Sequence, residues 1–136
     1  MTNARPGDAV SEFVEVMRRL RTECAWKAGQ THASLVPFLR EETEELVEAI
    51  ESGDVDHLCE ELGDVLLQVV FHAAIAEQAG EFTLDDVARG ITDKMRRRNP
   101  HVFDPASIGR SPDDPPLDPV AIDELWERIK AEEKKA

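Results

Sequence analysis

Apolar residues recur along most of the chain at the three- and four-residue spacing that places them on one face of a helix. The first such segment carries Val10, Phe13, Val14, Met17 and Leu20. The pattern predicts an all-α bundle of four core helices followed by a C-terminal helix. The expected helices span about residues 9–22, 31–52, 54–79, 83–98 and 120–134.

The two central helices are separated by Ser52-Gly53-Asp54, a sequence typical of a tight turn. Glycine readily ends a helix, and Asp54 is a favourable N-cap for the next one. Thr31 is a candidate N-cap at the start of the first central helix, and Thr83 at the start of the fourth helix. The sequence therefore predicts an antiparallel hairpin that turns at Gly53.

A hairpin that turns at Gly53 brings side by side residues that are equally far from it in sequence. Glu45 and Glu61 are each eight residues from Gly53, and Glu42 and Asp64 are each eleven residues away. The two pairs are about 4.5 Å apart along the helices at a rise of about 1.5 Å per residue, and they share one face. We therefore expect four carboxylates to converge on a volume the size of one or two hydrated cations.

The position of these acids favours a metal site over a solvated acidic surface. Glu42 falls within the apolar stripe of its helix, where an unpaired charge is costly. Glu61 and Asp64 continue into a polar stripe with Gln68 and His72. Clustered carboxylates raise one another's pKa, and a hard divalent cation removes that repulsion. Oxygen ligands suit Mg²⁺, or Mn²⁺ in its place.

A basic segment, Lys94-Met95-Arg96-Arg97-Arg98, ends the fourth helix of this strongly acidic chain. Basic residues suit a helix C-terminus, and they could equally hold a triphosphate whose metal is bound by the acids. Trp26 has two comparable interpretations, stacking on a nucleobase or filling the core.

The composition of the chain excludes several classes of function. The formal charge of −13 argues against a general nucleic-acid or membrane-surface binder. No apolar run reaches about 18 residues, and the first eight residues lack a signal-peptide pattern. Cys24 and Cys59 are expected to be free thiols in a reducing cytoplasm. No glycine-rich phosphate loop is present, so the Rossmann and P-loop classes are excluded.

We expect three parts along the chain. Residues 1–104 form a helical catalytic domain, and residues 105–119 form a linker rich in proline and aspartate that should be extended. Residues 120–136 form a helix that is too short to be stable alone and must therefore dock on its own core or on a partner chain.

The motifs together resemble the all-α nucleoside triphosphate pyrophosphohydrolases, and most closely the MazG family, over residues 10–104. The chain departs from the family at Cys24-Ala25-Trp26-Lys27, where the family usually has C-P-W-D, and at Asn99, where it often has His. The matching motifs are E-E-x-x-E at Glu41–Glu45, E-x-x-D at Glu61–Asp64, Gln30-Thr31-His32, Glu60–His72 and Arg97–Phe103.

The resemblance implies a homodimer or a dimer of dimers that hydrolyses nucleoside triphosphates to monophosphate and pyrophosphate. The expected mechanism is a metal-dependent attack of water on the α-phosphorus. The expected role is housecleaning of the nucleotide pool in the cytoplasm. The implied metal ligands are Glu42, Glu45, Glu61 and Asp64. The other implied catalytic and substrate-binding residues are Glu41, Glu60, Lys94, Arg97, Arg98, Trp26 and Trp126.

Other functions fit parts of the same pattern. A pyrimidine-restricted, dUTPase-like all-α enzyme is the alternative within the enzyme class, and a non-catalytic nucleotide-binding helical regulator is the alternative outside it. A carboxylate-bridged di-iron bundle is disfavoured because no His follows a Glu by three residues, as the two E-x-x-H motifs of such bundles require.

Overall fold

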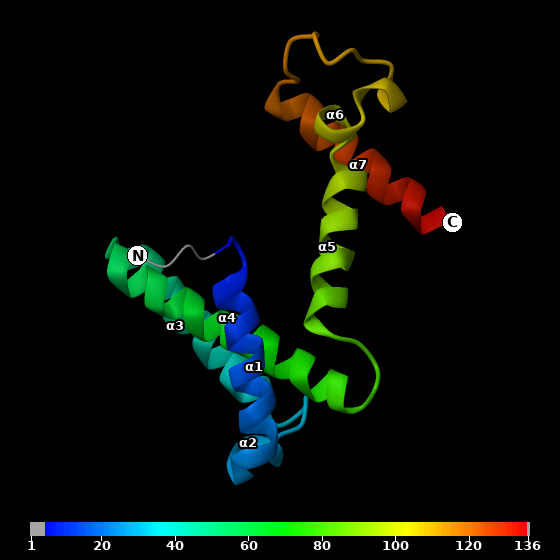
Figure 1. The fold of residues 1–136 in the computed structure, drawn as a ribbon. Helices are drawn as coiled ribbons and strands as arrows, with labels where there is room; N and C mark the ends of the chain where they lie inside the picture. The colour runs from blue at the N-terminus through cyan, green and yellow to red at the C-terminus, as the bar shows by residue number, and fades with distance from the viewer. Residues whose placement is uncertain (1–4, 136) are drawn as a thin grey trace. The chain divides into compact units, whose positions relative to one another are not determined.

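The computed structural model describes residues 5–135, and within that range it contains helices and turns but no strand (Figure 1). The all-α prediction is therefore confirmed. The chain divides into two compact units, Met1–Val87 and Ala88–Ala136, which are described separately. The helices are α1 (Asp8–Glu23), α2 (Ala25–Ala28), α3 (Val36–Ser52), α4 (Val55–Gln78), α5 (Leu84–Arg98), α6 (Pro100–Phe103), the 3₁₀ helix η1 (Pro105–Ile108) and α7 (Pro119–Lys135).

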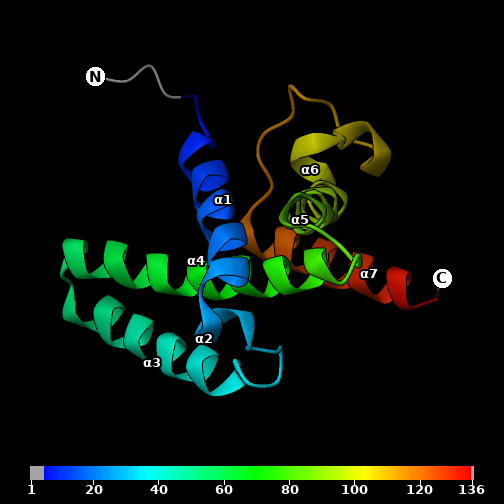
Figure 2. The same ribbon diagram turned by 60° about the horizontal axis from the view of Figure 1, so that its bottom comes forward.

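In the first unit, α3 and α4 form the predicted antiparallel hairpin, and α1 crosses α4 (Figure 2). Gly53 ends α3 in the left-handed conformation, with φ of 73°. The Asp54 carboxylate accepts hydrogen bonds from the backbone N–H groups of Asp56 and His57, at 3.0 and 3.2 Å. This turn fixes which residues of the two helices lie at the same level.

The core of the first unit lies where α1 meets α4. Met17 of α1 packs with Val70 and Phe71 of α4 and with Leu35, which immediately precedes α3. Each of these four side chains is at most 2% exposed. Because the apolar stripe of α1 supplies one side of this core, burial of these side chains holds α1 against the hairpin. Partly buried side chains around the core are Phe13, Val14, Leu20, Leu67, Ile75 and Leu84.

The connection between α1 and α3 is more ordered than the sequence predicts. It contains the short helix α2, and Arg21 donates hydrogen bonds to the backbone carbonyls of Lys27, Ala28 and Gln30. The guanidinium group thus ties α2 and the residues that follow it to α1.

The prediction that Thr31 caps the first acid-bearing helix is wrong. Thr31 instead opens a turn in which its hydroxyl accepts a hydrogen bond from the Ser34 N–H at 3.1 Å. The helix α3 begins at Val36, with Pro37 in its first turn. Proline has no N–H to leave unsatisfied, so it suits this position.

The fourth helix begins as predicted, because Thr83 and Asp86 exchange hydrogen bonds. The Asp86 N–H donates to the Thr83 hydroxyl at 3.2 Å, and the Thr83 N–H donates to the Asp86 carboxylate at 2.9 Å. This reciprocal pair satisfies two N–H groups at the helix start.

In the second unit, α7 docks on its own chain through the buried Leu125. The segment expected to be extended, residues 105–119, departs from that expectation. It contains η1, a turn closed by Ser111 and Asp114, and a hydrogen bond from the Arg110 side chain to the Pro115 carbonyl. Local hydrogen bonds between polar side chains and the backbone therefore shape a segment whose prolines suggested an open chain.

Both cysteines are free thiols, as predicted. Among the helices of the described residues, none combines the length and the apolar character needed to cross a membrane.

We expect Gly53→Ala to lower the free energy of unfolding by about 1 kcal/mol, because alanine is strained in the left-handed conformation. Gly63→Ala is the matched control. Gly63 lies within α4, and an added Cβ there meets no atom within 4 Å. That change should stabilise the protein by up to about 1 kcal/mol, because alanine is the better helix former. Urea denaturation of both variants measures the difference, and a shift in the same direction for both would contradict the turn assignment.

Candidate metal centre

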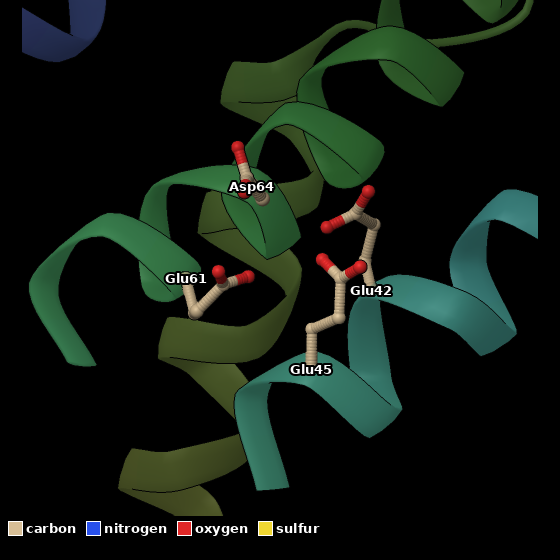
Figure 3. Close-up of side chains that lie close together, drawn as sticks. All are labelled: Glu42, Glu45, Glu61 and Asp64. Atoms are coloured by element: carbon tan, nitrogen blue, oxygen red, sulfur yellow. The ribbon is translucent and has the colours of Figure 1, made fainter. Parts of the chain in front are cut away.

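Four carboxylates converge between α3 and α4 as the hairpin spacing predicts (Figure 3). Glu42 and Glu45 come from α3, and Glu61 and Asp64 come from α4. One ligand oxygen from each side chain lies within 4.8 Å of the corresponding oxygens of the others. The turn at Gly53 sets this level, and the i and i+3 spacing keeps both acids of each helix on the facing side.

Burial makes this group different from acids on a solvated helix surface. Glu61 is only 8% exposed, and the other three side chains are half-buried. Among the described residues, the Oε2 atoms of Glu42 and Glu61 are buried without a hydrogen-bond partner. His57 Nε2 lies 3.4 Å from Oε1 of Glu61 and offers it partial compensation. Buried carboxylate oxygens without donors are costly, so the cluster needs a cationic or hydrogen-bonding ligand.

The pKa values of two of these acids are raised, as expected for buried carboxylates that lack hydrogen-bond donors. Burial, followed by the charges of Glu45 and Asp64, raises the pKa of Glu42 from its ordinary value of 4.5 to about 7. Burial and the same two charges raise the pKa of Glu61, while His57 opposes the shift. In the metal-free protein, a proton on Glu42 therefore relieves part of the repulsion.

The donor set fits a hard divalent cation. It consists of carboxylate oxygens, which suit Mg²⁺ and Mn²⁺ better than the softer metals that prefer nitrogen or sulfur. Mg²⁺ commonly uses one or two carboxylates and completes its octahedron with water or phosphate oxygens. Four carboxylates from two helices could therefore hold one or two such ions and leave coordination positions for a ligand.

A buried polar stripe continues from the acids along α4. Gln68 is 5% exposed, and its Oε1 atom has no partner among the described residues. His72 lies further along, with its Nδ1 atom 2.7 Å from Nδ1 of His32 and with the two rings nearly parallel. Burial, followed by the charge of His32, lowers the pKa of His72. This histidine pair links α4 to the segment that precedes α3.

The remaining predicted residues of the first unit lie outside the cluster. Glu41 and Glu60 are exposed on α3 and α4. Trp26 is 51% exposed, so it does not fill the core. Its ring contacts Phe38 edge-on, with centroids 5.7 Å apart, and the Lys27 amine lies 5.4 Å from its centroid. About half of the Trp26 surface therefore remains exposed to solvent.

Three of the predicted basic and aromatic residues come together in the second unit. The Arg98 guanidinium lies 5.1 Å from the ring centroid of Trp126. Arg97 Nε and Arg98 Nη2 donate hydrogen bonds to the two carboxylate oxygens of Glu133, at 2.7 and 2.9 Å. Lys94 is half-buried on the same helix, α5. We call Arg97, Arg98, Trp126 and Glu133 the arginine cluster.

Two contacts in the structure were not predicted from the sequence. Glu133 was not singled out, although it follows Trp126 by seven residues and so shares its helix face. His32 and His72 were each noted but not paired, because they are 40 residues apart and belong to different elements. Helical periodicity could have indicated the first contact but not the second.

The fold and site define an all-helical protein whose central hairpin carries a candidate divalent-metal centre. The chain belongs to the family of the MazG nucleotide pyrophosphohydrolase domain, whose sequence profile matches residues 30–103. The resemblance seen in the sequence motifs is therefore confirmed.

Two curated relatives support this assignment, and one solved structure has a similar fold. The chain is 48% identical over 130 residues to a nucleoside triphosphate pyrophosphohydrolase/pyrophosphatase MazG of Thermotoga maritima, covering 94% of the chain and 46% of the relative. It is 39% identical over 128 residues to the nucleoside triphosphate pyrophosphohydrolase of Escherichia coli K12, covering 92% and 46%. The chain thus spans about half the length of these relatives.

The solved structure is that of a mazG-related protein from Thermotoga maritima. It matches with a TM-score of 0.72 at 23% identity and covers 89% of this chain and 98% of the other. At this identity, the likeness establishes the helical fold.

The raised pKa of Glu42 predicts how the stability of the metal-free protein depends on pH. Between pH 4.5 and 7, the folded state keeps a proton that the unfolded state has lost. The stability linked to this proton is full below pH 4.5 and is lost as the pH rises through 7. We expect Glu42→Gln to remove this dependence and to stabilise the metal-free protein above pH 7 by on the order of 1 kcal/mol.

Denaturation across this pH range measures the effect, and Glu44→Gln is its matched control. Glu44 is exposed on the same helix, so its substitution should leave the pH dependence unchanged. An identical pH profile for Glu42→Gln and the unsubstituted protein would contradict the electrostatic account of the cluster.

Proposed function

We propose that this protein hydrolyses nucleoside triphosphates, including deoxynucleoside triphosphates, to monophosphate and pyrophosphate with Mg²⁺, or with Mn²⁺ in its place. The observation that carries the proposal is the convergence of four carboxylates, two of them with buried unpartnered oxygens, in a member of the MazG family. The names of the curated relatives as nucleoside triphosphate pyrophosphohydrolases support the same reaction. Nucleotide-pool housecleaning in the cytoplasm is the role we propose for it.

The proposed metal ligands are Glu42, Glu45, Glu61 and Asp64. A bound divalent cation supplies charge neutralisation and polarises a phosphoryl oxygen. A carboxylate of the cluster or one beside it takes the proton of the water that attacks the α-phosphorus, because these are the bases nearest to the reacting atoms. The exposed Glu41 and Glu60, at the edge of the cluster, support that water or bind the substrate.

The basic residues of α5 are the proposed ligands of the leaving pyrophosphate. Arg97 and Arg98 present N–H groups to two oxygens of a single anion, the arrangement by which guanidinium groups bind phosphate. Lys94 adds positive charge on the same helix. The exposed ring of Trp26 and the ring of Trp126 are the proposed nucleobase contacts, since aromatic faces stack on bases with little sequence preference.

Product analysis tests the reaction. Each common NTP and dNTP is incubated with the protein and Mg²⁺, and the products are separated. We expect monophosphate and pyrophosphate, lost on chelation, and a decrease in turnover of about 100-fold or more in Glu42→Gln with the fold intact. Glu44→Gln should remain active.

Four outcomes would each overturn a different part of the proposal. An active, metal-dependent Glu42→Gln would reject the site assignment. Diphosphate and phosphate as products would reject attack on the α-phosphorus. Nucleotide binding that depends on Mg²⁺ without any turnover would favour the non-catalytic regulator, while turnover limited to dUTP and dCTP would favour the pyrimidine-restricted enzyme.

We infer that a second copy of the chain covers α4. Four apolar residues of this helix, Val55, Leu62, Leu66 and Val69, are between 39% and 77% exposed in the single chain. Their spacing of seven, four and three residues places them along one stripe. An apolar stripe beside the carboxylate hairpin suits a self-complementary contact in a homodimer or dimer of dimers.

Leu66→Glu should shift the protein toward the monomer, because it places a charge in the proposed contact. Leu66→Met is the matched control, since it keeps the apolar surface and nearly the same volume. Sedimentation equilibrium of both variants measures the mass. A monomeric unsubstituted protein, or an unchanged oligomer in Leu66→Glu, would contradict this inference.

A further inference from the structure

The Glu133 carboxylate bridges the guanidinium groups of Arg97 and Arg98. Its Oε1 atom accepts a hydrogen bond from Arg97 Nε at 2.7 Å, and its Oε2 atom accepts one from Arg98 Nη2 at 2.9 Å. Guanidinium groups bind carboxylate and phosphate in the same way, through charge-assisted N–H to oxygen bonds. A phosphate therefore competes with Glu133 for the same donors.

Protonation cannot release this carboxylate near neutral pH. The hydrogen bond from Arg98, followed by that from Arg97, lowers the pKa of Glu133 to about 2. Glu133 therefore stays ionised and keeps neutralising the arginines whenever no other anion is present. Release requires an anion that binds the two guanidinium groups more strongly.

The structure gives such an anion access to Arg97. A cavity of about 600 Å³ is lined by both partners of one ion pair, Arg97 and Glu133, and by Arg128 and Glu132 of α7. This volume lies within the range of small-molecule sites in proteins. When the Glu133 carboxylate turns away, the guanidinium groups of Arg97 and Arg128 outnumber the one remaining carboxylate of the lining, that of Glu132, which suits an anionic ligand.

Arg98 is held in place by more of its surroundings than Glu133 is. Arg98 is 15% exposed, and its guanidinium lies against the Trp126 ring, so it remains in place without Glu133. Glu133 belongs to the last turn of α7, which ends at Lys135, and helix ends fray readily. Turning the Glu133 side chain toward solvent leaves the packing of Arg98 on Trp126 intact.

We propose that Glu133 is an internal substitute for phosphate, which the phosphate chain of the ligand displaces from Arg97 and Arg98. Glu133 thereby sets the affinity of the cluster for polyphosphate, and it takes no part in the chemical step. This inference rests on the proposed role of the two arginines in binding the leaving pyrophosphate. It adds that the chain carries its own competitor for that role.

Binding of inorganic pyrophosphate, measured by isothermal titration calorimetry without divalent cations, tests the inference. Removal of the competitor in Glu133→Gln should tighten binding by up to about fivefold, the range expected for a solvent-accessible ion pair. Glu124→Gln is the control, because Glu124 is an exposed acid on the same helix and its loss changes the net charge equally. It should leave the affinity for pyrophosphate unchanged.

Glu133→Asp separates displacement from net charge. Aspartate keeps the charge but is one methylene shorter, so it cannot bridge both arginines equally well. We expect tighter pyrophosphate binding than in the unsubstituted protein, by less than in Glu133→Gln. In turnover assays, Glu133→Gln should lower KM and leave kcat unchanged.

Weaker pyrophosphate binding in Glu133→Gln would overturn the inference, because it would make Glu133 a residue that positions the arginines for the ligand. Equal affinity in Glu133→Gln and the unsubstituted protein would also overturn it, as would equal tightening in Glu124→Gln. The binding assay requires no catalysis, so its result is independent of the proposed function. A chain that hydrolyses no nucleotide could still show the effect, and an active one could fail to show it.

Discussion

The repulsion among four carboxylates held between α3 and α4 is the constraint on which the rest of the structure depends. Left alone, these side chains would turn toward water or keep a proton, as the pKa of about 7 for Glu42 indicates. The hairpin keeps the side chains from turning toward water, because the turn at Gly53 fixes which residues of α3 and α4 lie opposite each other. The packing of Met17 against Val70 and Phe71 holds α1 against α4, so apolar burial supports an arrangement that the charges oppose.

The two units place opposite charges in separate environments. The first unit concentrates carboxylates that lack donors, and the second concentrates guanidinium groups that Glu133 already neutralises. The two clusters also differ before any ligand binds. The acids need a partner, whereas the arginines have one that must leave.

Much of the site could be predicted because it depends on local rules. The glycine turn and the spacing of the acids on either side of it determine the convergence of Glu42, Glu45, Glu61 and Asp64, and both are visible in the sequence. The polar stripe through Gln68 and His72 follows from helical periodicity in the same way. The structure differs from the predicted start of α3 at Thr31 because a threonine hydroxyl can close a turn as readily as it caps a helix.

The sequence by itself determined the helical class, the hairpin and the four acids that face each other across it, because these depend on periodicity and on equal distances from one turn. Tertiary structure decided the pairing of His32 with His72, the exposure of Trp26 and the contact of Glu133 with Arg97 and Arg98. Each of these depends on how separate elements pack. Packing is set by the sum of many weak apolar contacts, and no local pattern in the chain records that sum.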